Sequence, residues 1–425
     1  MRVIWDRRME TLDRAGLQEL QEARLGWSLG WAKGRVPFYQ ERLKGWQEGM
    51  NPLKVLADLP FTVKADLREN YPLGFLAVPR QEVRRFHASS GTRGNPTVVA
   101  YTEHDLVVWA EVVARSLAAA GMKPGQTLHN AYGYGLFTGG LGLHAGAERL
   151  GLSVIPASGG STERQVKLLV DLAPDGLACT PSYALYIAET LSQMGISPNE
   201  VSLTTGIFGA EPWSNGMRER LEAGFGIQAV DIYGLSEITG PGVAMECVEG
   251  KNGLHVFEDF FLVEVINPQT GEGVEPGIVG EMVLTTLSKE AMPMIRYRTG
   301  DLVSVNPEPC PCGRTSVRIS RIHGRSDDML IVRGVNVFPS EVERVILSQE
   351  GVSPHYQLVF EGHPSRPDLV VELEEMMPGA LDGSGLTRRL TSALGVRLGV
   401  RIMAAGQVPR SQGKAVRVVS RIKED

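Results

Sequence analysis

A short loop rich in glycine and hydroxyl side chains is the first segment of this chain that could do chemistry. Residues 88–96 read Ala-Ser-Ser-Gly-Thr-Arg-Gly-Asn-Pro, and residues 98–101 follow as an apolar, strand-like run. Glycines let backbone N–H groups converge on an anion, and the hydroxyl groups add further donors. The loop lacks the Gly-Lys-Ser/Thr ending of a Walker loop, and no helix start follows it. The pattern fits either a phosphate-binding loop of another nucleotide fold or an ordinary turn between two strands.

Four further clusters place charged side chains beside turns. Residues 233–237 (Tyr-Gly-Leu-Ser-Glu) and 297–301 (Tyr-Arg-Thr-Gly-Asp) each end on a carboxylate. Residues 324–328 (Gly-Arg-Ser-Asp-Asp) combine both charges, and residues 409–414 (Pro-Arg-Ser-Gln-Gly-Lys) end on a single lysine. Each cluster alone is a weak signal, because turns that contain glycine and aspartate are common. Their value lies in their order and spacing.

Three of the four cysteines gather near one histidine. Cys247 and His255 are separated by seven residues, and Cys310 and Cys312 follow a proline-rich turn. Three thiolates and an imidazole form a closed tetrahedral ligand set of the structural zinc type. The Cys-x-Cys spacing is tighter than the usual Cys-x₂-Cys. Structural zinc and buried free thiols therefore both remain open on the sequence.

Composition and charge exclude several functional classes. The net charge of −6 over 425 residues argues against a general nucleic-acid-binding protein, which needs a basic surface. The start of the chain carries charges within any apolar stretch, so we predict no signal peptide. The longest apolar segment, residues 106–121, contains Glu111 and Arg115 and is not a membrane span. Four cysteines in a chain of this length are not a disulfide framework. We expect a cytoplasmic enzyme with neither a membrane nor a nucleic-acid partner.

Helix and strand patterns alternate from about residue 97 to residue 300. Stretches with helical spacing of apolar residues separate short apolar runs, which predicts an α/β layer structure with largely parallel strands. Residues 261–305 differ, because strand patterns at 262–266 and 280–284 flank a turn and predict an antiparallel unit. The expected helices are 103–120, 162–172, 182–194 and 213–225, and the expected strands include 152–156 and 206–208.

The two ends of the chain have other patterns. The first fifty residues are helical in pattern until Pro37 interrupts them. A boundary falls near residues 324–328, and the remaining hundred residues predict a small α+β domain. Its expected elements are a strand at 329–332, a helix at 341–349 and strands at 358–360, 369–373 and 400–403. We therefore predict an α/β protein whose large multi-sheet N-terminal domain, residues 1–324, combines layered βα units with a small antiparallel region.

The loop at residues 88–96 and the four charged clusters, taken in this order and spacing, closely resemble motifs of the adenylate-forming superfamily. This superfamily contains acyl-CoA synthetases, carrier-protein adenylation domains and luciferases. Residues 130–140, 208–213 and 335–339 (Asn-Ala-Tyr-Gly-Tyr-Gly-Leu-Phe-Thr-Gly-Gly, Phe-Gly-Ala-Glu-Pro-Trp and Val-Asn-Val-Phe-Pro) resemble its phenylacetate–CoA ligase subgroup. The resemblance extends from residue 37 to residue 414. The chain departs from the usual loop, Ser-Ser-Gly-Thr-Thr-Gly-Lys-Pro, at Arg93 and Asn95. These two positions replace a threonine and a potential phosphate-binding lysine.

The resemblance implies two half-reactions. A carboxylate attacks the α-phosphorus of ATP, giving an acyl-adenylate and pyrophosphate, and the thiol of CoA then displaces AMP. Donors and cations must be aimed at the phosphate oxygens, where charge develops. It also implies that the small C-terminal domain, residues 329–425, rotates between the half-reactions about a hinge at 325–328 that pivots on Asp327.

The resemblance also gives each candidate site residue a role. Glu237 holds Mg²⁺, a metal that prefers carboxylate and phosphate oxygens. Lys414 bridges the acyl carboxylate and the α-phosphate. The remaining nucleotide-binding residues contact the phosphates (Ser89, Ser90, Gly91, Thr92 and Gly94), the ribose (Asp301 and Arg325) and the adenine (Ala210, Glu211, Pro212 and Tyr233).

The acid pocket is expected to be aromatic and closed. Aromatic residues on the glycine-rich segment face a wall formed by residues 207–210, and no charged residue enters the set, which favours an apolar acid such as phenylacetate. The pocket residues are Tyr132, Tyr134, Phe137, Ile207, Phe208 and Gly209. Two other hypotheses remain open. In the first, the enzyme transfers the acyl or adenylyl group to another acceptor, either a carrier protein or a deazaflavin coenzyme. In the second, the protein is a non-catalytic nucleotide-binding relative. The family is typically dimeric, so we expect a homodimer.

Overall fold

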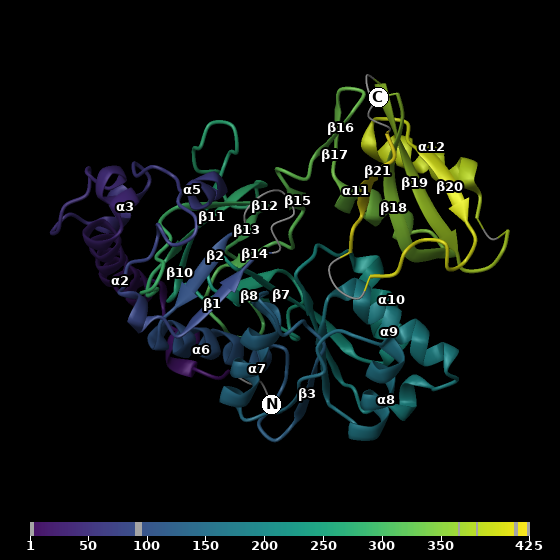
Figure 1. Cartoon of the computed structure of the whole chain (residues 1–425), viewed down its shortest axis with the longest axis horizontal. Helices are drawn as coiled ribbons and strands as arrows, with labels where there is room; N and C mark the ends of the chain where they lie inside the picture. Colours follow the sequence, from purple (N-terminus) through teal and green to yellow (C-terminus); the bar gives the residue numbers. More distant parts are fainter. Residues whose placement is uncertain (1–3, 90–95, 364–365, 380, 412–414, 423–425) are drawn as a thin grey trace.

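The computed structural model describes residues 4–89, 96–363, 366–379, 381–411 and 415–422. An N-terminal part holds the helices and strands up to β15, and a C-terminal part begins at β16 and stands at the upper right of Figure 1. None of the helices within the described ranges is both long and apolar enough to cross a bilayer.

A nine-stranded sheet forms the centre of the N-terminal part. Five neighbouring strands are parallel, in the order β4-β3-β5-β6-β7. These strands are β3 (Thr127–Asn130), β4 (Ser153–Ile155), β5 (Gly176–Cys179), β6 (Thr205–Gly209) and β7 (Gln228–Leu235). Four antiparallel strands extend the sheet beyond β7, so the prediction of largely parallel strands holds for only part of it. They are β8 (Gly240–Glu246), β9 (Leu254–Val256), β14 (Arg318–Ile319) and β13 (Val305–Asn306).

Helices cover both faces of the parallel strands. The helices α6 (Glu103–Ala119) and α7 (Gly139–Leu150) pack on one face, in the same core as Ile207 and Val230. The other face, which includes Phe208 and Ala229, packs against α8 (Thr162–Leu172), α9 (Pro181–Gln193) and α10 (Asn215–Phe225). Figure 1 shows the two groups of helices on either side of the sheet. The four helices predicted in this region are confirmed to within two residues.

Local capping explains where these helices begin. Thr102 and Asp105 form a capping box at α6, in which Thr102 Oγ1 accepts from the Asp105 amide at 3.2 Å and Asp105 accepts in return at 3.0 Å. Asp105 also accepts from the amides of Glu290 and Ala291, at 2.7 and 2.9 Å. The start of α6 is thereby attached to the segment that follows β11.

Antiparallel strands and the N-terminal helices complete this part. The predicted loop does connect two strands, since β1 (Arg85–Ala88) pairs with β2 (Val98–Tyr101). The antiparallel unit is confirmed as a four-stranded sheet of β10 (Phe261–Ile266), β11 (Gly280–Thr286), β12 (Tyr297–Val303) and β15 (Gly324–Arg325).

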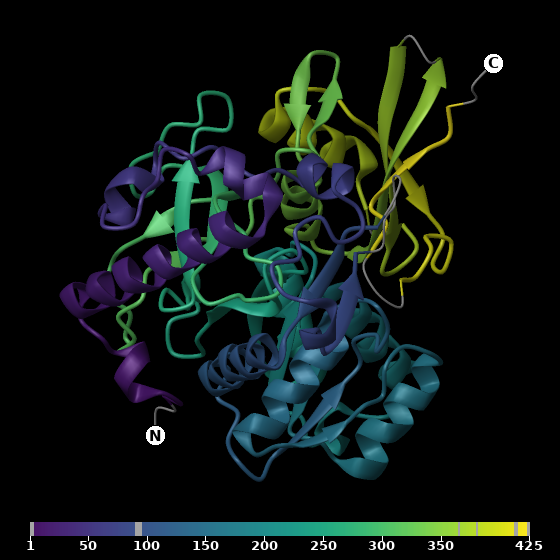
Figure 2. The same ribbon diagram turned by 60° about the vertical axis from the view of Figure 1, so that its left-hand side comes forward.

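Helix α2 (Arg14–Arg35) lies across this antiparallel region in Figure 2. Pro37 interrupts the helical run and also begins the next helix, α3 (Pro37–Arg42), because proline suits the first helical position. Short helices α1 (Arg7–Glu10), α4 (Pro52–Leu56) and α5 (Lys64–Glu69) surround them.

The C-terminal part is the predicted small α+β unit. Its sheet has the order β20-β19-β18-β21, with an antiparallel centre and parallel edge pairs. Its last strand was not predicted. The elements are β16 (Leu330–Val332), β17 (Val335–Val337), α11 (Pro339–Leu347), β18 (Val352–His363), β19 (Arg366–Glu375), α12 (Gly383–Leu394), β20 (Gly399–Met403) and β21 (Val418–Ser420).

Candidate functional site

Three segments that are far apart in the sequence meet at Asp301. The Tyr233 hydroxyl donates to Asp301 Oδ2 at 2.6 Å, and Arg325 Nη1 donates to Oδ1 at 2.8 Å. The strand pairing explains the second contact, because Asp301 of β12 lies opposite Arg325 of β15. Burial and the charge of Asp301 raise the pKa of Tyr233, so the phenol keeps its proton and donates. The structure thus brings together three predicted nucleotide-binding residues.

Arg325 also connects this site to the predicted hinge. Its guanidinium forms a two-pronged ion pair with Asp327, at 2.8 and 3.0 Å. Burial opposes ionisation of Asp327, but the hydrogen bond and charge of Arg325, with a smaller contribution from Lys64, keep the pKa of Asp327 below its usual range. The charged groups of residues 325–327 are therefore fixed to the end of β15.

Glu237 lies just after β7 and is 5% exposed. Lys64, the first residue of α5, places its Nζ 3.4 Å from Glu237 Oε1. Nothing in the sequence pointed to Lys64, because a lysine in the first turn of a short helix is normally a solvated surface residue. The buried Lys289 donates to the Ile238 carbonyl, and burial lowers the pKa of its ammonium to about 8. Two lysines that the sequence analysis missed thus lie beside the predicted magnesium ligand.

The predicted phosphate loop begins at Ser89. Ser89 Oγ accepts from the Thr97 amide at 3.0 Å, and the Ser89 amide donates to the Thr97 carbonyl at 3.0 Å. These bonds close the base of the loop between β1 and β2. The other predicted phosphate-loop residues and the predicted catalytic lysine lie outside the described residues: Ser90, Gly91, Thr92, Gly94 and Lys414.

The glycine-rich segment after β3 is held by a polar network. Asn130 Nδ2 donates to the Tyr134 hydroxyl and to the Gly140 carbonyl, both at 2.8 Å, and the Tyr134 hydroxyl contacts His144 Nδ1 at 3.1 Å. A Cβ atom at Gly140 would lie only 2.5 Å from the Gly133 carbonyl oxygen, so glycine is required there for the segment to fold back on itself. Tyr132 is buried, and Phe137 is 43% exposed.

The facing wall differs from the prediction at Phe208. Ile207 shares a core with Tyr132, whereas the Phe208 ring lies on the opposite face of β6 and packs edge-on against Trp213, at 5.9 Å between ring centroids. Neighbouring residues of a strand point to opposite faces, so Ile207 and Phe208 do not belong to one wall. Gly209 is the last residue of β6, and the turn at residue 210 follows it.

The turn after β6 carries the three residues predicted to border the adenine together with Tyr233, and that role stays a prediction. Ala210 has a left-handed φ of 70°, and Pro212 is exposed. The Glu211 carboxylate is already used within the chain, because it accepts from the Ser182 amide and from the Ala415 amide, each at 2.8 Å. The second of these bonds connects the N-terminal part to the segment near the end of the chain.

The three cysteines and the histidine do meet at one point. The ligand atoms of Cys247, His255, Cys310 and Cys312 all lie within 4.8 Å of one another, and all four residues are buried. His255 Nδ1 faces Ser316 Oγ at 3.2 Å, which leaves Nε2 directed at Cys312 Sγ at 3.3 Å. A hydrogen bond from Cys247, followed by the neighbouring imidazole, lowers the pKa of Cys312. The geometry of the four buried ligand atoms suits a tetrahedral zinc ion.

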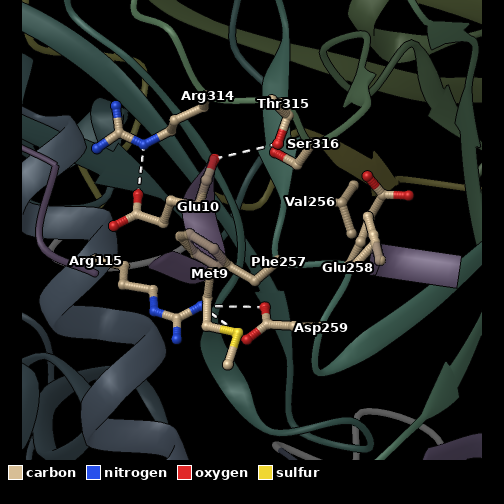
Figure 3. Close-up of a pocket in the computed structure, with 11 residues that line it drawn as sticks. Met9, Glu10, Arg115, Val256, Phe257, Glu258, Asp259, Arg314, Thr315 and Ser316 are labelled. Atoms are coloured by element: carbon tan, nitrogen blue, oxygen red, sulfur yellow. Dashed lines mark hydrogen bonds and ion pairs between the residues drawn. The ribbon is translucent and has the colours of Figure 1, made fainter. Parts of the chain in front are cut away.

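The N-terminal segment contacts the residues that directly follow Cys312 in the sequence (Figure 3). Arg314 Nε donates to Glu10 Oε2 at 2.5 Å, and both side chains are about 2% exposed. The Thr315 amide donates to the Glu10 carbonyl at 3.1 Å. Beside them, Arg115 pairs with Asp259 at 2.9 Å. No sequence pattern pointed to these contacts. Glu10, for example, lies about three hundred positions before its partners Arg314 and Thr315.

The family models and the known proteins that are similar to this chain agree with one another. Residues 86–288 match the AMP-binding enzyme family, and residues 334–421 match the AMP-binding enzyme C-terminal domain. Phenylacetate–coenzyme A ligase of Thermus thermophilus is 50% identical, over 98% of this chain and 99% of the relative. The enzyme of the same name from Escherichia coli is 49% identical, over 96% of each chain.

Solved structures of a more distant relative match this chain to different degrees. A 2-hydroxyisobutyryl-CoA ligase in its postadenylation state with 2-HIB-AMP matches with a TM-score of 0.91, at 28% identity over 97% of this chain and 91% of the relative. The same ligase with 2-HIB-AMP and CoA in its thioesterification state matches with a TM-score of 0.75, at 29% identity over 99% and 92%. The whole chain therefore superposes better on the postadenylation structure than on the thioesterification structure of that ligase.

Proposed function

The chain belongs to the phenylacetate–coenzyme A ligase family of AMP-binding enzymes, and we propose that it joins phenylacetate or a related aryl acid to CoA. An acid oxygen attacks the α-phosphorus of ATP, the bond from that phosphorus to the oxygen bridging to the β-phosphorus breaks, and pyrophosphate leaves. The CoA sulfur then attacks the acyl carbon, loses its proton and releases AMP. The observation that carries this proposal is the 50% identity to a phenylacetate–coenzyme A ligase over 98% of the chain.

We assign the nucleotide contacts from the cluster around Asp301. A carboxylate accepts two hydrogen bonds at once, which suits the two ribose hydroxyls, and Arg325 fixes the carboxylate in place. Tyr233 forms the adjoining wall beneath the base. In this proposal Lys414 donates to the acid and to the α-phosphate, where negative charge develops during the first half-reaction.

Mg²⁺ fits the environment of Glu237. Its buried carboxylate has Lys64 as an ion-pair partner at 3.4 Å, and a hard divalent cation prefers carboxylate and phosphate oxygens. The metal would neutralise charge on the phosphates while Glu237 holds it. Lys64 would supply a phosphate-directed cation, which offsets the lysine that the loop lacks at position 95.

We propose structural zinc at Cys247, His255, Cys310 and Cys312. All four ligand positions come from the chain and are buried, which suits a structural site and leaves no open position for a reactant.

We further propose that residues 1–324 form one domain and that residues 329–425 form a mobile second domain. Residues 325–328 are the hinge between them, with Asp327 as its pivot. Cytoplasmic location and a homodimer complete the proposal, and sedimentation equilibrium tests the dimer.

The decisive experiment measures pyrophosphate release with ATP, Mg²⁺ and a panel of acids, and then thioester formation with different acceptors. We expect phenylacetate and ring-substituted phenylacetates to give the highest kcat/KM, and a dicarboxylate such as malonate to give background rates, because the pocket set contains no charged residue. CoA should accept the acyl group, whereas a carrier protein and a deazaflavin should not. Absence of turnover with every aryl acid would refute the substrate assignment, and ATP binding without any adenylate would refute catalysis.

A further inference from the structure

Two carboxylates bind backbone amides across the boundary between the N- and C-terminal parts. Glu211, of the N-terminal part, accepts from the Ala415 amide at 2.8 Å. Glu343, on α11 of the C-terminal part, accepts from the Ser214 amide at 3.0 Å. Each part thus offers one carboxylate to an amide of the other. The arrangement is reciprocal.

Both carboxylates are also fixed within their own part. The second oxygen of Glu211 accepts from the Ser182 amide, in the first turn of α9, at 2.8 Å. The second oxygen of Glu343 accepts from the Tyr356 hydroxyl at 2.9 Å, and Glu343 is 4% exposed. A charged acceptor that is already oriented makes a stronger and more selective hydrogen bond than a mobile surface group.

Arg417 lies between the two carboxylates. Its Nη2 donates to Ser182 Oγ of the N-terminal part at 3.1 Å and lies 3.8 Å from Glu343 Oε2. Its guanidinium stacks over the Tyr356 ring, 4.2 Å from the centroid. The positive charge offsets the two negative ones, so the boundary does not hold uncompensated carboxylates.

We propose that Glu211, Glu343 and Arg417 form a clasp that holds the C-terminal part in the orientation of the first half-reaction and is broken before thioester formation. The inference rests on the proposed function, because it concerns the two half-reactions of that ligase. Two observations carry it: the reciprocal bonds cross the boundary, and the whole chain superposes better on the postadenylation structure of a relative than on its thioesterification structure. The clasp residues act by positioning the C-terminal part, and they do not touch the reacting atoms.

The clasp assigns a role to Glu211 that differs from adenine binding. If Glu211 bordered the adenine, its replacement would raise the KM for ATP. If it holds the C-terminal part, its replacement lowers the rate of adenylation at saturating ATP and leaves thioester formation from a ready-made adenylate intact. The two roles are therefore separable by kinetics.

The test uses the full chain with Arg417→Met, and Arg421→Met as the matched control. Arg421 lies four residues further along and pairs with Glu372 of the same part, at 2.6 and 2.8 Å. Adenylation is followed by pyrophosphate release, and the second half-reaction by mixing enzyme, synthetic phenylacetyl-adenylate and CoA. We expect Arg417→Met to slow adenylation roughly 10- to 100-fold, as expected for a lost charged hydrogen bond, with thioester formation within about twofold of the unmodified enzyme. Arg421→Met should leave both rates within about twofold.

Milder variants and a readout independent of activity keep the test decisive. Ser182→Ala and Glu343→Gln should slow adenylation in the same direction but less, and hydrogen exchange of the peptide that contains Ser214 should be faster in Arg417→Met than in Arg421→Met. Equal loss of both half-reactions, or unchanged adenylation in Arg417→Met, would overturn the clasp. If the unmodified enzyme makes no adenylate, the proposed function fails instead, and unchanged hydrogen exchange in Arg417→Met would then still overturn the clasp.

Discussion

The site around Asp301 and the cysteine cluster around Cys312 are both buried and polar, but they are closed in different ways. The four cluster ligands point at one another, and the N-terminal segment contacts the residues that follow Cys312 through the buried Arg314–Glu10 pair. Asp301, in contrast, is held by Arg325, which also pairs with Asp327 in the segment leading into the C-terminal part. The cluster is complete within the N-terminal part, whereas the Asp301 site lies at its boundary with a part that moves in our proposal. We therefore expect the cluster to determine stability and the boundary site to determine reaction rate.

The largest expected effect on reaction rate is at Lys414, on the reaction side of this comparison. Replacing it by alanine should slow adenylation roughly 100- to 1000-fold, the loss typical of one preorganised donor to a developing negative charge. Thioester formation from added phenylacetyl-adenylate should continue, and Tm should stay within about 1 °C of the unmodified enzyme. Pyrophosphate release, thioester formation and thermal unfolding are measured on one preparation. A variant that adenylates normally would remove Lys414 from the mechanism.

Much of the fold could be predicted from the sequence because local signals agreed with the tertiary structure. The helices at 162–172 and 181–193 begin at capping residues, and the antiparallel pair β10–β11 flanks a turn with a recognisable proline. The cysteine cluster was also predictable, because thiols and an imidazole form a chemically distinctive set even when they lie 65 residues apart. In these cases the information is contained in short segments or in unusual residue types.

The parts of the site that could not be predicted depend on partners distant in sequence. Ile207 and Phe208 are both apolar because helices cover both faces of β6, so no polar alternation indicates which of them faces the site. Lys64 and Glu211 are ordinary charged residues until the fold places Glu237 and Ala415 beside them. The adenine contact of Glu211 stays a prediction, and its hydrogen bond with the Ala415 amide could not be predicted from either segment alone.

The second prediction concerns the stability side of the comparison. Replacing Cys312 by serine should remove the bound zinc and lower Tm by about 5 °C or more, as expected for a loss of about 4–5 kcal/mol in a chain of this size. The ratio of the two half-reaction rates at 25 °C should be unchanged. Cys179→Ser is the matched control, since Cys179 is also buried but lies outside the cluster.

Metal analysis and thermal unfolding check this prediction. We expect about one zinc per chain in the unmodified protein and in Cys179→Ser, the stoichiometry of a single structural site, and almost none in Cys312→Ser. Retention of zinc and of Tm in Cys312→Ser would show that the cluster consists of free thiols. A change in the half-reaction ratio would show that the two regions are coupled.

The smaller of the two expected effects on stability lies between the two regions, at Asp231. This residue precedes Tyr233 by two positions on β7, and its amide donates to Glu246, the neighbour of Cys247, at 3.2 Å. Burial and the charge of Glu246 raise the pKa of Asp231 from 3.8 to about 7. Between these pH values Asp231 keeps its proton in the folded protein but releases it in the unfolded chain. The contribution of Asp231 to the free energy of unfolding is therefore full below about pH 4 and is lost as the pH rises through 7.

Asp231→Asn removes this titration and should flatten the dependence of stability on pH. Relative to the unmodified protein, the variant should gain stability as the pH rises from 5 to 8, by at most about 4 kcal/mol because each pKa unit corresponds to about 1.4 kcal/mol. Urea unfolding at several pH values measures the difference, and Asp171→Asn, at an exposed surface pair, is the control. Parallel stability curves for Asp231→Asn and the unmodified protein would mean that Asp231 is ionised when folded. The Arg218 pair with Glu246 would then have to compensate both buried carboxylates.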